Sequence, residues 1–573
     1  MIILGIHDGH DSSVALMQNG KIIYASQEER FSRLKADYGL PIGAIKDCLN
    51  FTKIKNFEID LVALGSHHLN PVLSHLKRNA NFSVSDWVDE QEKYWKQTLI
   101  KNKKISYYNL FKDKKFKKDK IYNYKGLLNT YMSRKDMDLF QKRRIEKITN
   151  ILSINKSKIN LIYHEDCHKY YSYFFSSKRV DGIAITCEGV GDYSSASVSE
   201  IKKNNFKIKS HNKENRLGHT YQYITLLLGM KPLQHEYKVM GLAPYASEYE
   251  INKCFKVFDD IQKVKKLDVV YKIKPKDFYF HFVEKLKKSR FDGIAGALQK
   301  FVEKILNQWF LSCKKNLKLK NFYFSGGVAQ NIKAGMSLNE NKNIGNIVIP
   351  PAAGDTSISL GACYKAAYDH CIKNKISTNN HIKPLDNLYL GSQIQEKEIK
   401  SFIEKNKIKN KYKITKNYKL SLIAKYLFNG KIIARCSGRM EFGLRALGNR
   451  SIICDPRFYS NIEKINKKIK KRDFWMPFTP TILKEDCNKY LSNKKKIDSK
   501  YMAMAFNTTD LGKQKLKAAI HPADFTTRPQ MLSYKDNPQY YKLIKEFKKL
   551  SGVGSLLNTS LNLHGLPIAR NTA

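Results

Sequence analysis

Two histidines lie four residues apart, at His164 and His168, directly after the apolar run 159–162. On a helix, side chains at this spacing share one face and can converge on a single metal ion. The same spacing is also common in solvated or hydrogen-bonded histidines, so a metal site needs a further ligand. Asp355 is the candidate, because it follows a predicted strand at 347–349 and a turn of small residues. Two histidines and one carboxylate are a ligand set of non-haem iron, and zinc or manganese would also fit it.

Polar turns follow three of the predicted strands in the first part of the chain. Strand 1–6 leads into His10-Asp11-Ser12-Ser13, and a hairpin with an Asn-Gly turn at 19–20 comes next. Strand 181–186 leads into Glu188 and Gly189, and strand 321–324 leads into Gly326-Gly327-Val328 and Asn331. Backbone amides, hydroxyls and glycines in such turns can approach phosphates, whereas the alternative is an ordinary polar hairpin loop.

Arginines among glycines mark a second candidate site beyond residue 430. The stretch 438–451 contains Arg439 and Arg445, and further donors follow. Arginine is well suited to phosphate and carboxylate groups, so an anion site is expected, with a basic surface loop as the alternative. The candidate residues are Arg439, Arg445, Lys470, Arg472, Arg528, Ser560 and Asn562.

The composition limits the classes of protein that fit. The 573 residues are 42% hydrophobic but contain no run long enough for a membrane span, so we expect a cytoplasmic protein without one. The ten cysteines occur singly, which argues against a disulfide framework or a zinc ribbon. The formal charge of +50 favours anionic partners. Because the lysines are spread along the whole chain, a composition bias on solvated faces explains them at least as well as nucleic-acid binding does, and small anions such as ATP would also be attracted.

The chain is too long for one core and is predicted to form two α/β domains. A polar linker near 377–384 places the boundary, giving a first domain at 1–385 and a second at 390–573. Between about residues 77 and 158, aromatic residues alternate with lysine runs. This stretch is interpreted as an insertion with helices and no chemistry of its own.

Taken together, these motifs resemble the nodulation- and cephamycin-type O-carbamoyltransferase family, and the resemblance runs nearly end to end. It rests on the following segments: 10–13, 29–33, His164 with His168, 236–245, 325–329, 351–355, 438–457, 470–477 and 558–567. The resemblance implies a duplicated sugar-kinase/actin-like ATPase domain followed by a smaller YrdC-like α/β domain.

The resemblance also implies an activity and a set of roles. The second domain would make carbamoyl-adenylate from carbamoyl phosphate and ATP, with Lys470 and Arg445 as catalytic residues. The first domain would transfer the carbamoyl group to a hydroxyl of a sugar-containing or secondary-metabolite acceptor, with His10 as general base beside Asp11. Fe(II), or another divalent metal, would lie on His164, His168 and Asp355, and Mg could accompany ATP. The nucleotide would contact Ser12, Glu188, Gly189, Gly326, Gly327, Val328 and Asn331.

Two departures from the family pattern stand out. Glu188 replaces the usual aspartate and is one methylene longer, and Met476 replaces an arginine that could contact phosphate. Two alternatives stay open. The charge of +50 leaves open a protein that directs carbamoylation to RNA, although nucleic acid is unlikely, and Met476 leaves open a degenerate nucleotide-binding protein. The acceptor, the native metal and the choice between monomer and homodimer are left undecided by the sequence.

Overall fold

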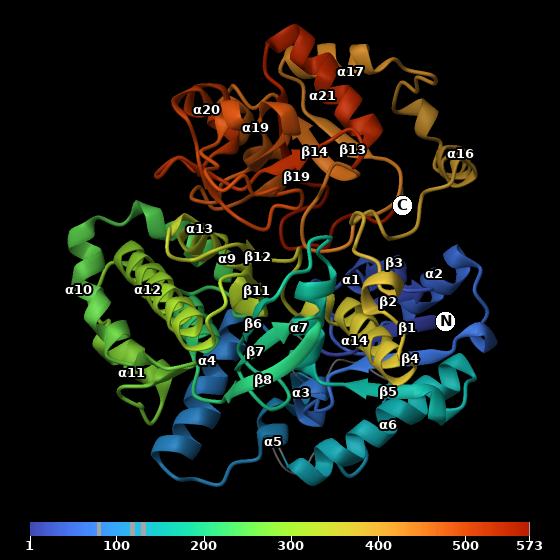
Figure 1. Ribbon diagram of the computed structural model, residues 1–573. Coiled ribbons are helices and arrows are strands. Elements are labelled where there is room, and N and C mark those ends of the chain that lie inside the picture. Colours follow the sequence, from blue (N-terminus) through green and yellow to red (C-terminus); the bar gives the residue numbers. More distant parts are fainter. Residues whose placement is uncertain (77–81, 115–120, 128–132, 572–573) are drawn as a thin grey trace. The chain divides into compact units, whose positions relative to one another are not determined.

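The computed structural model describes residues 1–76, 82–114, 121–127 and 133–571, which form an α/β protein (Figure 1). The chain divides into two compact units, Met1–Leu385 and Asp386–Ala573. The predicted start of the insertion at residue 77 lies outside the described residues. Within them, no helix is both long and apolar enough to cross a membrane.

The first unit begins with a five-stranded sheet in the order β3-β2-β1-β4-β5. β1 pairs antiparallel with β2 and parallel with β4, and the Asn19-Gly20 turn has positive φ at both residues, as a two-residue hairpin requires. The predicted hairpin is thus confirmed. The strands span β1 Ile2–His7, β2 Ser13–Gln18, β3 Lys21–Gln27, β4 Leu61–Gly65 and β5 Ile159–Ile162.

The second sheet repeats the order and strand directions of the first. Its order is β8-β7-β6-β11-β12, with β6 antiparallel to β7 and parallel to β11. Two sheets with this same topology, each opening on a hairpin, define the duplicated actin-like fold and confirm that expectation. The strands span β6 Gly182–Cys187, β7 Ala196–Lys202, β8 Asn205–Asn212, β11 Phe322–Ser325 and β12 Ile347–Val348.

Two helices at equivalent positions of the repeats pack against each other. α7 (His164–Phe174) follows β5, and α14 (Ile358–Lys373) follows β12. A Cβ atom on Gly361 would lie 2.0 Å from the carbonyl oxygen of Cys167, so only glycine allows this approach. α14 also lies on the first sheet, where a Cβ on Gly5 would meet the Ser359 carbonyl oxygen at 2.1 Å. The two helix N-termini therefore lie close together.

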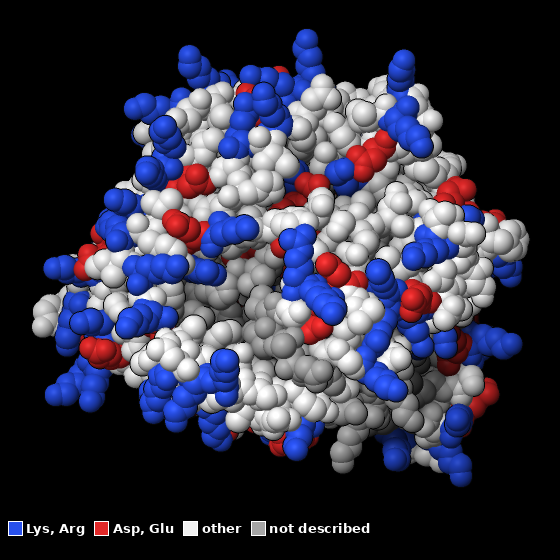
Figure 2. Space-filling view, turned by 90° about the horizontal axis from the view of Figure 1, so that it is seen from below, with Lys and Arg blue, Asp and Glu red and all other residues white. Residues whose placement is uncertain are grey.

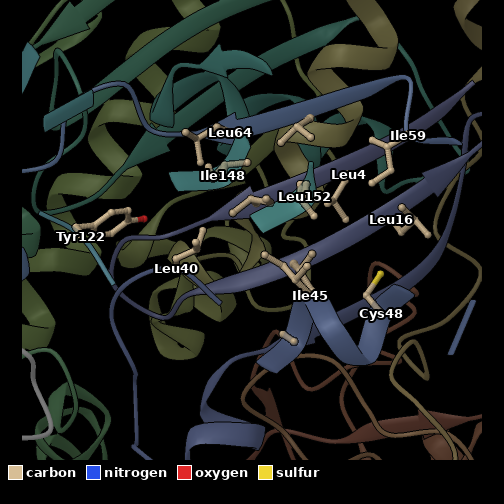
Figure 3. Packing of buried hydrophobic residues seen from close by; sticks show 14 of the residues in the cluster. Leu4, Leu16, Leu40, Ile45, Cys48, Ile59, Leu64, Tyr122, Ile148 and Leu152 are labelled. Carbon is tan, nitrogen blue, oxygen red and sulfur yellow. The ribbon is translucent and has the colours of Figure 1, made fainter. Parts of the chain in front are cut away.

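The opposite face of the first sheet carries an apolar core covered by α2 (Ile42–Thr52) and α6 (Arg134–Leu152). Figure 3 shows side chains of the strands, such as Leu4 and Leu64, packed with Ile45 of α2 and Ile148 of α6. The α6 helix belongs to the predicted insertion, which therefore completes this core. The other described helices of this part of the chain are α1 Glu29–Ser32, α3 Pro71–Leu76, α4 Val84–Asp89, the π-helical η2 Glu90–Ile100 and α5 Tyr107–Phe111. Residues of α3, α4, η2 and α5 form a separate apolar cluster with Leu226 and Tyr279.

The second sheet is covered on one side by the long helix α12 (Phe291–Leu317), whose Phe310 ring lies 4.8 Å from that of Phe322. On the other side, the Tyr173 ring of α7 lies 4.9 Å from that of Tyr323. The remaining elements of this unit are α8 Leu217–Leu227, α9 Glu236–Leu242, α10 Glu248–Asp259, β9 Gln262–Lys265, β10 Asp268–Tyr271, α11 Phe278–Lys285, α13 Ile332–Glu340 and α15 Thr378–His381.

The second unit is a smaller α/β domain built on the sheet β13-β14-β19-β15-β18. All neighbours in it are antiparallel except β15 and β18. Its strands are β13 Ile433–Cys436, β14 Arg450–Cys454, β15 Thr479–Leu483, β16 Phe506–Asn507, β17 Thr526–Thr527, β18 Gln530–Leu532 and β19 Ser555–Ser560. Its helices are α16 Glu396–Lys405, α17 Leu420–Phe428, α18 Ser460–Ile465, the π-helical η9 Asn466–Lys470, α19 Cys487–Tyr490, α20 Asp510–Lys515 and α21 Pro538–Ser551.

The surface matches the basic composition. Figure 2 shows Lys and Arg side chains scattered over the visible face, with Asp and Glu side chains among them. On this face the positive charge is not gathered into the single patch typical of nucleic-acid binders.

Candidate functional site

Four metal-ligand side chains meet where the two repeats face each other. His164 and His168 occupy successive turns of α7, Asp355 begins the short 3₁₀ helix before α14, and Glu188 follows β6. The Nε2 atoms of the two histidines are 3.2 Å apart. Glu188 Oε2 lies 2.7 Å from His164 Nε2 and 3.1 Å from His168 Nε2. Asp355 Oδ1 lies 3.5 and 3.6 Å from the same two nitrogens.

The local sequence positions this cluster. β5 delivers the chain to α7, and Asp192 accepts a hydrogen bond of 2.7 Å from the backbone N–H of His164. A carboxylate at this point satisfies an amide that a helix N-terminus leaves without an intrahelical partner. In the second turn, the carbonyl oxygen of His168 accepts from the Ser325 hydroxyl at 2.9 Å. The predicted helical pair is thus confirmed, and it is anchored at both residues.

The electrostatics of the cluster favour positive charge at its centre. Burial opposes protonation of His164, but the charges of Glu188 and Asp355 outweigh it and raise its pKa well above the ordinary value. The pKa of His168 is raised for the same reasons. Burial opposes ionisation of Asp355 and Glu188, yet the two imidazoles hold both carboxyl pKa values below their usual range. Two carboxylates therefore require a cation between them, either a proton on imidazole or a metal ion.

The donor set fits a transition metal. One ligand atom from each of the four residues lies within 4.8 Å of the others. Imidazole nitrogens together with carboxylate oxygens suit iron, zinc and manganese alike. Glu188 Oε1 and His168 Nδ1 are buried and have no hydrogen-bond partner among the described residues. Glu188 was predicted to contact nucleotide and was not counted among the predicted metal ligands, but its carboxylate lies beside both histidines.

The first polar turn forms a histidine–aspartate pair. His10 Nδ1 lies 3.3 Å from Asp11 Oδ2, and its buried Nε2 has no partner among the described residues. Burial opposes protonation, but the charge and hydrogen bond of Asp11, aided by Asp355 and Glu236, raise the pKa of His10 to about 9. Ser12 Oγ is likewise buried and unpartnered within the described chain. Without a metal, His10 therefore carries a proton at neutral pH.

Glu236, at the start of α9, is an unforeseen member of this neighbourhood. Burial raises the pKa of its carboxyl to about 7, although hydrogen bonds and the charge of His10 oppose the rise. Spacing along the chain indicates no role for the segment 236–245, although this segment is one of those that carry the family resemblance.

The glycine turns lie at the ends of β6 and β11. Gly326 has φ of +94°, and a Cβ there would lie 2.5 Å from the Cys187 carbonyl oxygen, so only glycine fits. Gly327 and Gly189 face open space, as expected if a ligand approaches them. Val328 is half-buried. Asn331 instead caps α13, accepting from the Ala334 N–H and bonding Gln299, which uses its polar atoms structurally.

In the second unit, Lys470 is buried with its Nζ on three oxygen atoms. It donates to the Ser560 carbonyl, to Ser560 Oγ at 3.2 Å and to Asn562 Oδ1 at 2.7 Å. Burial, reinforced by the charge of Arg472, lowers the pKa of Lys470 to about 7. The structure thus brings together three residues predicted from two separate motifs.

Arg528 lies among other cations. Burial, followed by the charges of Arg445 and Arg472, lowers its pKa, and its Nε has no partner among the described residues. Guanidinium groups gathered in this way are stabilised by an anion between them. Arg439 differs, because its Nε donates to the Gly391 carbonyl at 2.9 Å and its Nη2 to that of Leu390. Met476, at the position of the expected arginine, is buried.

The raised histidine pKa values predict how stability depends on pH. A group whose pKa is higher in the folded state stabilises fully below its unfolded value, and this stabilisation is lost as pH rises through the folded value. For His10, a change from 6.5 to about 9 is worth about 3 kcal/mol. The lowered carboxyl pKa values act only at acidic pH. In chelator-treated protein the histidines should therefore lose their stabilising contribution between about pH 7 and about pH 10.

Denaturant unfolding across this range measures the loss. The His10→Gln variant should show a shallower decline than the native chain. Lys470, whose pKa is lowered to about 7, adds stability as pH rises over the same range, so the difference between the native chain and His10→Gln isolates the contribution of His10. Identical slopes in the two proteins would contradict the charge assigned to His10.

The chain thus combines a duplicated actin-like unit, whose side-chain cluster could hold a metal ion, with an α/β unit in which cations gather. Residues 2–364 match the family described as Carbamoyltransferase N-terminus, and residues 424–573 match Carbamoyltransferase C-terminus. The chain belongs to this family and is a carbamoyltransferase.

Two relatives match nearly the whole chain, and a third matches about three quarters of it. Protein MJ1051 of Methanocaldococcus jannaschii is 31% identical, over 100% of this chain and 95% of its own length. Nodulation protein NolNO of Sinorhizobium fredii is 25% identical, over 98% of this chain and 76% of its own. Nodulation protein NolO of Bradyrhizobium diazoefficiens is 27% identical, over 72% and 74% respectively.

Proposed function

We propose that this carbamoyltransferase uses ATP and carbamoyl phosphate to carbamoylate a hydroxyl group of a sugar-containing acceptor. The observation that carries the proposal is the convergence of His164, His168, Glu188 and Asp355 at the facing ends of the two repeats. In the second unit, Lys470 and the arginines around Arg528 supply a separate site for anionic substrates.

The first step belongs to the second unit. Carbamoyl phosphate and ATP, with one water, would yield carbamoyl-adenylate, phosphate and pyrophosphate. Arg445, Arg472 and Arg528 would bind the phosphate groups, because guanidinium donors match phosphate oxygens in pairs. Lys470, with its pKa lowered to about 7, exchanges a proton readily near neutral pH.

The second step belongs to the first unit. The acceptor oxygen attacks the carbamoyl carbon, the bond to the AMP oxygen breaks, and AMP leaves. Gly189 and Gly327 leave room for the nucleotide, and Ser12 Oγ offers a hydrogen bond. A divalent metal on His164, His168, Glu188 and Asp355, proposed as Fe(II), would supply Lewis-acid polarisation.

His10 is proposed to take the proton of the acceptor hydroxyl at its free Nε2. Its pKa of about 9 must fall before it can act as a base near neutral pH. A divalent cation close to Asp355 would neutralise one of the charges that raise it. Asp11 holds Nδ1 and so keeps Nε2 directed away from the pair.

The test is an assay of pyrophosphate release by the purified full-length chain. Release should require both ATP and carbamoyl phosphate, and carbamoylated product should form when a hydroxyl acceptor of the aminoglycoside or oligosaccharide type is added. Pyrophosphate release that does not depend on carbamoyl phosphate would overturn the proposed first step.

Metal content gives an independent check. We expect about one transition-metal ion per chain, and the His164→Ala/His168→Ala variant should retain less than about a tenth of it, since it lacks half of the ligands. The matched control is His370→Ala, a histidine of α14 outside the cluster, whose ring lies beside His381. Elemental analysis measures the metal content of each variant. Full metal occupancy in the His164→Ala/His168→Ala variant would contradict the proposed metal site.

A further inference from the structure

The insertion contributes one buried arginine to the neighbourhood of the cluster. Arg144, on α6, is fully buried, and its guanidinium forms an ion pair with Asp8 directly after β1. Nε donates to Asp8 Oδ2 at 2.8 Å and Nη2 to Oδ1 at 2.6 Å, while the Tyr122 hydroxyl donates to Oδ2 at 2.6 Å. A bidentate pair of this kind fixes orientation as well as charge.

The same guanidinium also holds the segment 66–68 that follows β4. Arg144 Nη2 donates to the Ser66 carbonyl at 3.0 Å, and Nη1 donates to the His67 carbonyl at 3.2 Å. From the other side, Asp192 accepts the N–H groups of His67 and His68 at 2.8 and 2.9 Å. The segment is therefore held at its carbonyls by the insertion and at its amides by the β6–β7 turn.

The hydrogen bonds from Arg144 and Asp192 maintain an unusual backbone conformation in this segment. Ser66 has φ of +71°, in the left-handed region that a serine rarely adopts. Residues in such conformations persist where the surrounding contacts determine them. In this conformation Ser66 Oγ lies 2.8 Å from His164 Nδ1. The Nε2 atom of that imidazole faces Glu188 and Asp355.

We propose that Arg144 is a positioning residue for the metal ligand His164, acting through the backbone of Ser66 and the hydroxyl of that residue. A metal-bound histidine usually hydrogen-bonds through its other ring nitrogen, which fixes the tautomer and the ring orientation. Here Ser66 Oγ is that partner. The insertion, which the sequence marked as free of chemistry, thereby helps to build the metal site. This inference rests on the proposed metal function of the cluster.

The experiment measures Co²⁺ binding to the chelator-treated full-length chain, because the visible absorption of this ion reports both affinity and coordination geometry. Arg144→Met should weaken Co²⁺ binding by about 10- to 100-fold and alter the spectrum, as losing an outer-shell partner typically does. The matched control is Arg143→Met. Arg143 is the adjacent residue of α6, and its guanidinium donates to the backbone carbonyls of Lys125 and Asn123.

Loss of Arg144 alone leaves Asp8 buried without its cation, which could unfold the chain. Asp8→Asn/Arg144→Met removes both charges and is the second variant. The third is Ser66→Gly, which deletes the hydroxyl, while glycine tolerates the positive φ. Asp8→Asn/Arg144→Met and Ser66→Gly should each weaken Co²⁺ binding. When all three substitutions are combined, the loss of affinity should be smaller than the product of the two separate losses, because both variants act on the same imidazole, that of His164.

Co²⁺ affinity and spectra like those of the native chain in any folded variant lacking Arg144 would overturn the proposal. So would independent, multiplicative effects of Ser66→Gly and Asp8→Asn/Arg144→Met. If the native chain itself bound no Co²⁺, this result would contradict the proposed metal function of the cluster. Native binding with unaffected variants would refute only the role of Arg144.

Discussion

Asp355→Asn should reduce carbamoyl transfer by about 10³-fold while leaving carbamoyl-phosphate-dependent release of pyrophosphate unchanged. The side chain lies 3.5 Å from His164 Nε2 in the first unit, whereas the proposed adenylate site lies in the second. The amide keeps the shape of the carboxylate but removes the negative charge that favours a cation in the cluster. Lewis-acid stabilisation of roughly 4 kcal/mol corresponds to about three orders of magnitude in rate.

Parallel assays of pyrophosphate and carbamoylated acceptor check this separation. The matched control is Asp369→Asn, an exposed aspartate of α14 paired with Lys365, which should lose neither activity. Carbamoyl-adenylate supplied chemically should not rescue Asp355→Asn, because the deficit lies at the transfer step. If pyrophosphate release disappears in this variant, the two steps have been assigned to the wrong units.

Lys470→Ala is expected to abolish both activities, with a loss of about 10³-fold or more in pyrophosphate release. The Nζ of Lys470 bonds Ser560 and Asn562, so truncation removes one charge and frees two neighbouring polar groups. Losing the buried, charge-assisted hydrogen bonds of Lys470 costs about 3 to 5 kcal/mol. In the proposed site, this loss should weaken the binding of the substrate phosphate groups.

Supplied carbamoyl-adenylate should restore transfer in Lys470→Ala, the opposite of the result expected for Asp355→Asn. Lys468→Ala is the matched control, since Lys468 is exposed on the same π-helical segment. Pyrophosphate release that survives in Lys470→Ala would exclude this lysine from the adenylate step.

The sequence predicted the parts of the site that depend on local periodicity. His164 and His168 could be paired because a spacing of four residues places side chains on one helical face wherever a helix forms. The duplicated fold followed from the family motifs, and the hairpin at Asn19-Gly20 followed from turn chemistry. Asp355 was selected because acids often follow buried strands, and the structure brings it to the histidines.

Contacts between distant segments had no such signal. Glu188 joins the cluster, rather than only a nucleotide turn, because α7 and the β6–β7 turn meet after the two repeats have packed. Asn331, expected at the nucleotide, has its side chain used in capping α13. Arg439, expected at a phosphate, donates to the carbonyls of residues 390 and 391. Residue type alone cannot separate these uses, since the same donors serve structure and ligand.

The sequence alone therefore identifies the groups capable of chemistry and the elements that carry them. Tertiary structure alone decided which groups share a site, because side-chain convergence depends on packing between elements that are far apart in the chain. Arg144 shows this most clearly. Its helix looked like part of a basic insertion, yet burial against Asp8 and Ser66 gives its charge a fixed place and connects it to His164.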